Sequence, residues 1–213
     1  MEKKDNFFVK LAKNKYFCMF WHLFAVIFVT WYGTFPNWAS DVTFQATASQ
    51  IGLDFPWHFK MWGIFSAFSL LLNITYMFRR YDYRSKLARW LMYIGCFCIM
   101  ITINIPSTEI MSLQLVAHWS TALLFAVLNA ASIAMFLLHN LKKSKKVLAT
   151  FIMFAAMCAL MIILLIAFGK NGAIESIPIW GAYLVLFLMN YTNAYEKDLN
   201  GTAAVQKKET VKK

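Results

Sequence analysis

The sequence predicts an all-α membrane protein, a polytopic transmembrane bundle of six helices with both termini in the cytoplasm. Three observations support this fold class. Of the 213 residues, 60% are hydrophobic and only 15% are charged, which is more apolar surface than a soluble domain of this size can bury. Apolar runs of near membrane-spanning length recur along almost the whole chain. The basic residues fall in alternate connecting segments, as the positive-inside rule requires.

Six segments are predicted to cross the membrane, and together they form one membrane domain, residues 1–195. They cover approximately residues 16–34, 58–78, 90–105, 115–138, 147–169 and 179–195. The third and sixth fall short of the roughly 20 residues that a spanning helix needs, so they require flanking residues or local thinning of the bilayer. The remaining segment, 196–213, is polar and basic and is predicted to be a disordered cytoplasmic tail.

The orientation follows from the distribution of Lys and Arg. All of the 21 basic residues except Lys60 and Lys170 lie in the N-terminal head, the second and fourth loops and the C-terminal tail. With six spans these four segments share one side, which the positive-inside rule identifies as the cytoplasm. The net charge of +11 is therefore a topology signal, and nucleic acid is not an expected partner.

The outer face is predicted to carry the acidic residues of three loops, opposite Lys60 and Lys170. These acids are Asp41, Asp54, Glu109 and Glu175. Two interpretations remain open. The acids form a cation or amine site, or they are solvated loop residues without a ligand.

Two histidines are predicted to lie at similar depth near the outer edge. His58 opens the second span, and His118 sits about one turn inside the fourth. An ionisable group within a span is costly enough to be a functional candidate. The alternative is a neutral histidine that is hydrogen-bonded to a neighbouring helix, and for His22, in the inner half of the first span, this alternative is preferred.

Polar residues also follow stripes at helical spacing. His118, Asn129 and Ser132 share one face of the fourth span, and similar stripes run along the second and sixth spans. If these stripes turn inward they line a cleft that opens at the outer face, although interhelical hydrogen bonds alone would need the same pattern. The predicted ligand-binding residues are Asp41, Asp54, His58, Glu109, His118 and Asn129, and no catalytic residue is assigned.

No metal or cofactor is predicted. Two haems would need a second histidine pair, and His22 and His139 differ in depth. A zinc ion held by His58 and His118 with a carboxylate would lack the tight ligand spacing typical of such sites. The four cysteines all fall within spans, so no disulfide is expected.

Four short motifs resemble a known family. They are "WASDV" with Ser40 and Asp41, "DFPWHF" with Pro56, "AHWSTALLFAVLNAAS" with His118, and the closing "ESIPIWGAYLVLFLMNYTNAYEKDL". In this order, with six spans and both ends cytoplasmic, the chain resembles the Frag/DRAM/Sfk family, which includes damage-regulated autophagy modulators and the N-terminal part of fungal cell-wall biogenesis proteins. The resemblance implies a role in lipid organisation, lipid-anchor remodelling or autophagic and lysosomal trafficking.

The expected function is therefore that of a non-enzymatic multi-pass protein in the plasma membrane or an endolysosomal membrane. Its outward-facing polar cleft would bind a lipid headgroup, so membrane lipids are the expected partners. Two alternatives stay open: a small-molecule transporter or S-component-like binding subunit, and a membrane-embedded acyl- or phosphotransferase with His118 as its base.

Overall fold

The computed structural model describes residues 7–35, 44–107 and 112–199, and this part of the chain is helical with no strand. The prediction of an all-α fold is confirmed. The helices are α1 (Phe7–Leu11), α2 (Lys15–Tyr32), α3 (Ala48–Asp54), α4 (Pro56–Arg80), α5 (Lys86–Thr102), α6 (Leu113–Asn140), the 3-10 turn η1 (Leu141–Lys143), α7 (Lys145–Phe168) and α8 (Gly172–Tyr191).

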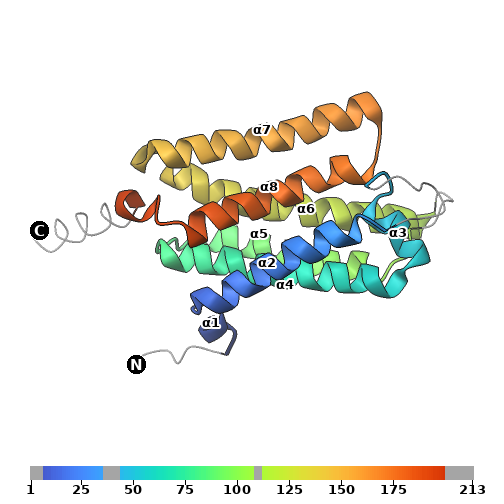
Figure 1. The fold of residues 1–213 in the computed structure, drawn as a ribbon, viewed down its shortest axis with the longest axis horizontal. Helices are drawn as coiled ribbons and strands as arrows, with labels where there is room; N and C mark the ends of the chain where they lie inside the picture. The colour runs from blue at the N-terminus through green and yellow to red at the C-terminus, as the bar shows by residue number, and fades with distance from the viewer. Residues whose placement is uncertain (1–6, 36–43, 108–111, 200–213) are drawn as a thin grey trace, which may run out of the picture.

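The long helices α2, α4, α5, α6, α7 and α8 lie alongside one another, and consecutive ones run in opposite directions (Figure 1). The bundle thus has two distinct ends. One end holds the starts of α2, α5 and α7 with the ends of α4, α6 and α8, and we call it the basic end because it carries Lys15, Arg80, Lys86 and Lys145. The other end holds α3 and the turn between α7 and α8, and we call it the α3 end.

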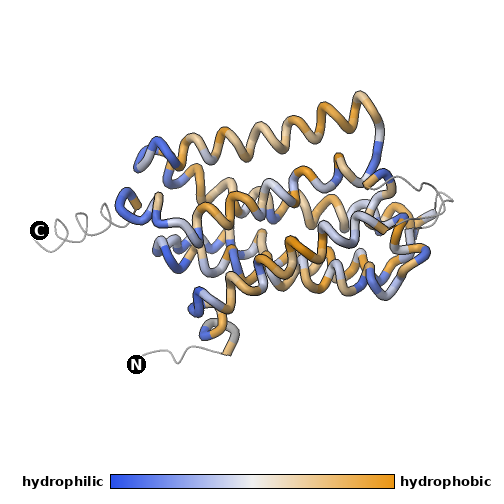
Figure 2. The backbone as a smooth tube through the Cα atoms, in the orientation of Figure 1, coloured by the Kyte–Doolittle hydropathy of each residue, from blue (hydrophilic) through white to orange (hydrophobic). Residues whose placement is uncertain are grey.

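Five of these helices, α2, α4, α6, α7 and α8, are long and apolar enough to cross a membrane. Figure 2 shows hydrophilic residues gathered at the two ends and hydrophobic residues along the helices between them. The chain therefore has the architecture of an integral membrane protein with several spans. The remaining long helix, α5, has 17 residues and packs along α6.

The helices begin where their sequences provide a capping side chain. Asn14, Ser85, Ser112, Ser144 and Asn171 each precede a long helix and accept a hydrogen bond from a backbone N–H of its first turn. Such caps satisfy donors that the start of a helix leaves without intrahelical partners. The helix α4 instead begins with a proline, Pro56, whose missing N–H costs nothing at this position.

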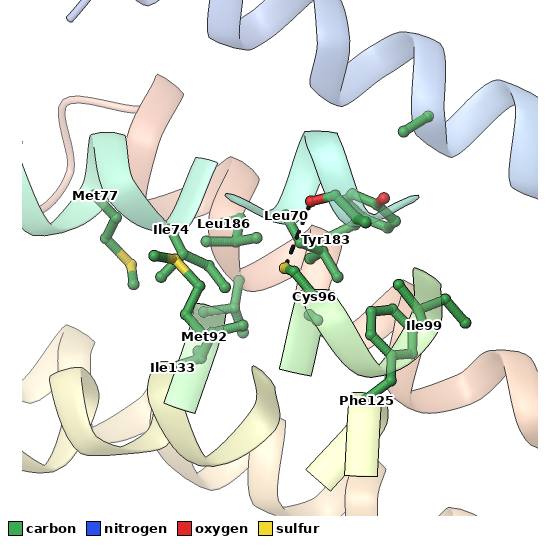
Figure 3. Packing of buried hydrophobic residues seen from close by; sticks show 14 of the residues in the cluster. Leu70, Ile74, Met77, Met92, Cys96, Ile99, Phe125, Ile133, Tyr183 and Leu186 are labelled. Atoms are coloured by element: carbon green, nitrogen blue, oxygen red, sulfur yellow. Dashed lines mark hydrogen bonds between the residues drawn. The ribbon is translucent and has the colours of Figure 1, made fainter. Parts of the chain in front are cut away.

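The buried core lies among α2, α4, α5, α6 and α8, and α7 stands at its edge. Figure 3 shows part of this packing, with Ile74 and Leu70 of α4 against Met92 and Cys96 of α5. Along α7, in contrast, most apolar side chains are exposed, including Ile152, Ile163 and Ile166. An exposed apolar helix of this kind is suited to contact with lipid tails.

Several boundaries differ from those expected from the sequence. The helix α5 starts at Lys86 rather than residue 90, and α8 starts at Gly172 rather than residue 179. Beyond α8, Tyr195 and Leu199 are buried in the core, so the chain stays packed into the first residues of the predicted tail. Residues 200–213, the rest of that tail, lie outside the described residues.

Candidate functional site

The described residues among those predicted to bind a ligand do not gather around the one cavity discussed below. Asp41 and Glu109 lie outside the described residues, so their part in the prediction stays open. His58 and His118 both lie near the α3 end but contact different residues. Asp54 is the last residue of α3, and Asn129 lies about three turns along α6 from His118. The surroundings of each described residue explain this separation.

His58 is half-buried in an aromatic group at the ends of α2 and α3. Its ring lies 5.4 Å from the ring of Phe35, 5.9 Å from that of Phe55 and 6.2 Å from that of Trp31, measured between centroids. Rings at this separation pack edge to face. His58 therefore forms part of a packed aromatic surface.

His118 is buried between α6 and the end of α5. Its Nδ1 lies 2.7 Å from the carbonyl oxygen of Ile105, and its ring lies 6.1 Å from the ring of Phe59. Since consecutive helical residues point about 100° apart, His58 and Phe59 face different neighbours. His118 thus contacts a different face of α4 from the one that carries His58, and its hydrogen bond joins α6 to the segment that follows α5.

The other two described residues have separate surroundings. Asn129 is buried against α5, where its Nδ2 donates to the carbonyl oxygen of Phe125 at 2.8 Å and its Oδ1 accepts from the Cys96 thiol at 3.7 Å. Asp54 is exposed at the end of α3. Within the described ranges, no group of three His, Cys, Asp or Glu side chains could hold a metal ion.

The structure places a cavity of about 60 Å³ at the α3 end, between α2, α3, α4 and α8. Its lining residues are Val29, Tyr32, Gly33, Phe44, Ala46, Ala48, Ile51, Trp62, Gly172, Glu175, Ser176 and Ile179. Neither His58 nor His118 is among these described lining residues. The cavity is nevertheless at the end of the bundle where the sequence predicts an outward-facing cleft.

The segment of residues 44–48 lines one side of this cavity. The backbone N–H groups of Gly172 and Ala173, at the start of α8, donate to the carbonyl oxygens of Gln45 and Phe44 at 3.1 and 2.7 Å. The hydroxyl of Tyr32 donates to the carbonyl oxygen of Ala48 at 2.9 Å. Gly172 is required here because a Cβ at this position would lie 2.1 Å from the carbonyl oxygen of Ala46.

Glu175 supplies the acidic side chain of the cavity. It lies in the first turn of α8 and pairs with Lys170, whose Nζ is 3.5 Å from its Oε1. The Lys170 ammonium also lies 5.5 Å from the ring centroid of Trp119. Because the side chain of Glu175 is 37% exposed, its carboxylate is within reach of solvent as well as of the cavity.

Three aromatic side chains, those of Tyr32, Phe44 and Trp62, line the same cavity as this carboxylate. A carboxylate beside aromatic faces attracts cations through both charge and cation–π interactions. Glu175 is one of the four acids predicted on the outer face, but it is not among the predicted binding residues. Asn171, a helix-capping residue four positions before it, is the signal that would have placed Glu175 on a helix rather than in a loop.

Comparison of the chain with protein-family models, with curated proteins and with solved structures finds no match. The resemblance to the Frag/DRAM/Sfk family accordingly stays a prediction from the motifs.

Proposed function

We propose that the chain is a six-span membrane protein whose basic end faces the cytoplasm and whose cavity at the α3 end faces outward. The five long apolar helices support several crossings, and α5 supplies the sixth. Its 17 residues rise about 25 Å at 1.5 Å per residue, slightly less than the roughly 30 Å hydrocarbon core, so it crosses with modest local thinning. The basic clusters at one end support the orientation.

We further propose that the cavity binds the ammonium group of a lipid headgroup. The observation that carries this proposal is the placement of the Glu175 carboxylate beside Tyr32, Phe44 and Trp62 in one cavity. The volume of about 60 Å³ exceeds the roughly 10–15 Å³ that a single water molecule needs. It suits a small polar group rather than a whole lipid.

The ion pair of Glu175 with Lys170 supports the same chemistry. The carboxylate already accepts an ammonium group from within the chain, and Lys170 has the ring of Trp119 as a second partner. A ligand ammonium would exchange with that of Lys170 at Glu175. Binding of this kind fits a non-enzymatic protein, and the family resemblance extends the proposal to lipid organisation or trafficking.

The test is lipid binding by the purified protein in nanodiscs, read by native mass spectrometry. We expect retention of phosphatidylethanolamine over phosphatidylglycerol, because only the former carries an ammonium group. Glu175→Gln should weaken retention about 10- to 100-fold, the equivalent of one charge-assisted hydrogen bond of about 1.5–3 kcal/mol. Lys170→Gln should strengthen retention, since it removes the competing ammonium.

Asp54→Asn is the matched control, because it removes an exposed carboxylate from the same end of the bundle without altering the cavity lining. A second experiment adds free ethanolamine to the lipid-bound protein and measures whether the lipid is displaced. Displacement of the lipid by ethanolamine at low concentration would indicate a small-amine binding subunit instead. Equal retention of the two lipids, or equal effects of Glu175→Gln and Asp54→Asn, would overturn the ammonium site.

A further inference from the structure

A column of buried polar side chains runs through the interface of α2, α4 and α8, three helices that contact one another pairwise. We call it the polar column. Its members are His22, Ser66, Ser69, Asn73, Tyr183 and Asn190, and each is at most 2% exposed. They come from all three helices, and none of them belongs to the cavity lining.

The polar column begins directly beneath the floor of the cavity. Trp62 of α4 and Ile179 of α8 line the cavity, and Ser66 and Tyr183 follow one turn further along the same faces. On α2, Val29 lines the cavity, and His22 lies two turns away on the same face. The cavity and the polar column are therefore consecutive parts of one interface.

In the described part of the chain, four buried side-chain atoms have no hydrogen bond of regular geometry, and all four belong to this column: Nδ1 of His22, Oγ of Ser66, the hydroxyl of Tyr183 and Oδ1 of Asn190. The hydroxyl of Tyr183 nevertheless interacts with those of Ser66 and Ser69, so Nδ1 of His22 and Oδ1 of Asn190 are the two of these atoms without a partner among the described residues. The ring of His22 lies 5.3 Å from that of Tyr183 and 5.5 Å from that of Tyr191. His22 thus connects the upper part of the column, at Ser66 and Tyr183, with the lower part.

Toward the basic end the column is held by direct hydrogen bonds. The Nδ2 of Asn73 donates to the carbonyl oxygen of Ser69 at 2.8 Å, and the Nδ2 of Asn190 donates to that of Asn73 at 2.9 Å. The hydroxyl of Tyr191 donates to Oδ1 of Asn73. Of the four atoms, those of Ser66, Tyr183 and His22 therefore lie in the upper and middle parts, closer to the cavity, and Oδ1 of Asn190 lies at the lower end.

Buried polar atoms in proteins nearly always have a partner, and water supplies it where the protein does not. Lipid tails cannot act as that partner. We propose that the polar column is a hydrated site, entered by water from the cavity and reaching His22 near the middle of the bundle. Its ligand class is water and uncharged solutes of similar size. The proposal rests on the position of the cavity and not on the ammonium binding proposed above.

Silver ions test this proposal because they are small, soluble in water and reactive with thiols, and they do not cross apolar packing. Ser66→Cys places a thiol in the column, and Ala67→Cys places one in the next position of α4, which is buried against α5 near Cys96. The protein in nanodiscs is exposed to silver nitrate in chloride-free buffer, then unfolded and alkylated. A silver ion bound to a thiol protects it from alkylation, and peptide mass spectrometry quantifies the protected fraction of every cysteine. Cys96 and Cys98 therefore act as internal buried controls.

We expect the thiol of Ser66→Cys to react with silver at least about tenfold faster than that of Ala67→Cys. Hydration favours the reactive thiolate, and dry burial suppresses it. Ser176→Phe should fill the cavity and slow the reaction at Ser66→Cys to the control rate. Should Ser66→Cys fail to fold, Ser69→Cys one turn deeper replaces it.

Equal rates at the two positions would overturn the hydrated column, as would a fast reaction that Ser176→Phe leaves unchanged. Neither result would bear on Glu175, whose role is measured by lipid retention. A failure of the ammonium site would likewise leave the silver experiment intact.

Discussion

Asn129 shows how a single polar residue can sit inside the bundle for reasons of packing. It faces Gly95 of α5, and a Cβ at Gly95 would lie 2.5 Å from the Nδ2 of Asn129. The amide fills the space that the glycine leaves, while its two polar ends are bonded to Phe125 and Cys96. Small residues are frequent where membrane helices approach closely. The role that the structure supports for Asn129 is therefore contact between α5 and α6.

Gly95→Ala is expected to destabilise the protein by about 1–3 kcal/mol, the usual cost of forcing a methyl group into a filled core. The measurement is reversible unfolding in detergent micelles. The double variant Gly95→Ala with Asn129→Ala should recover part of the loss, because the second substitution vacates the space that the methyl group needs. Additive losses in the double variant would show that the two residues do not oppose each other.

The histidines illustrate what sequence patterns resolve at this scale. Burial and depth could be predicted from the hydrophobic segments, and His118 and His22 are indeed buried. Hydrogen-bond partners could not, because they depend on how each helix is rotated about its axis. His118 bonds to the backbone at Ile105, whereas His22, expected to bond to a neighbouring helix, has a ring nitrogen without a partner among the described residues.

At the scale of elements, the end of α4 holds the end of α8 in place. Arg80 donates to the carbonyl oxygens of Asn190 and Thr192, and the hydroxyl of Tyr81 donates to the carbonyl oxygen of Met189 at 2.7 Å. The carbonyls in the last turn of a helix lack intrahelical partners. The side chains of one helix thereby cap another that is more than 100 residues distant in the chain.

Tyr81→Phe tests this contact through its dependence on pH. Burial raises the pKa of Tyr81 from its ordinary value of about 10 to about 12, although the Arg80 charge opposes the shift. The folded state therefore favours the protonated hydroxyl. The stability that this hydroxyl contributes is fully present below pH 10 and is lost as the pH rises toward 12.

We expect Tyr81→Phe to cost about 1 kcal/mol at neutral pH, the usual net value of one hydrogen bond, and the difference from the wild type to shrink between about pH 10 and 12. Unfolding in detergent as a function of pH measures both effects. Tyr16→Phe is the control, because the side chain of Tyr16 is 76% exposed. An alkaline loss of stability that is identical in wild type and Tyr81→Phe would assign that loss to another group.

The existence of each long helix could be predicted from the sequence because long apolar runs are a strong signal, but the ends could not. The sequence places the start of the last helix near Ile179, since Glu175 and Pro178 read as loop residues. The structure starts α8 at Gly172 with Asn171 as its cap and continues it through Pro178. Prolines are tolerated in membrane helices where neighbours satisfy the freed backbone groups. This seven-residue shift moves Glu175 from a loop into the cavity.

At the scale of the whole molecule, the polar stripes of different helices face different neighbours. The stripes of α4 and α8 meet each other and α2, whereas the stripe of α6 turns to α5, where the hydroxyl of Ser132 donates to the carbonyl oxygen of Ala88 at 2.8 Å. A stripe in the sequence shows that a face is buried but not which neighbour buries it. The polar residues of α6 thus form hydrogen bonds with α5, whereas the cavity and the polar column lie in a separate interface, that of α2, α4 and α8.

The orientation and the number of spans can be tested together by placing single cysteines at the two ends of the bundle, in a background without the native cysteines. Asp54→Cys and Asn104→Cys lie at exposed positions of the α3 end, and Arg84→Cys and Lys142→Cys at exposed positions of the basic end. In intact cells, a membrane-impermeant maleimide should label the first pair directly and the second pair only after permeabilisation. Arg84 and Asn104 flank α5, so labelling both from the same side would show that α5 does not cross. Labelling the basic end alone would reverse the orientation and place the Glu175 cavity on the cytoplasmic side, where the proposed exposure to outer-leaflet headgroups would not hold.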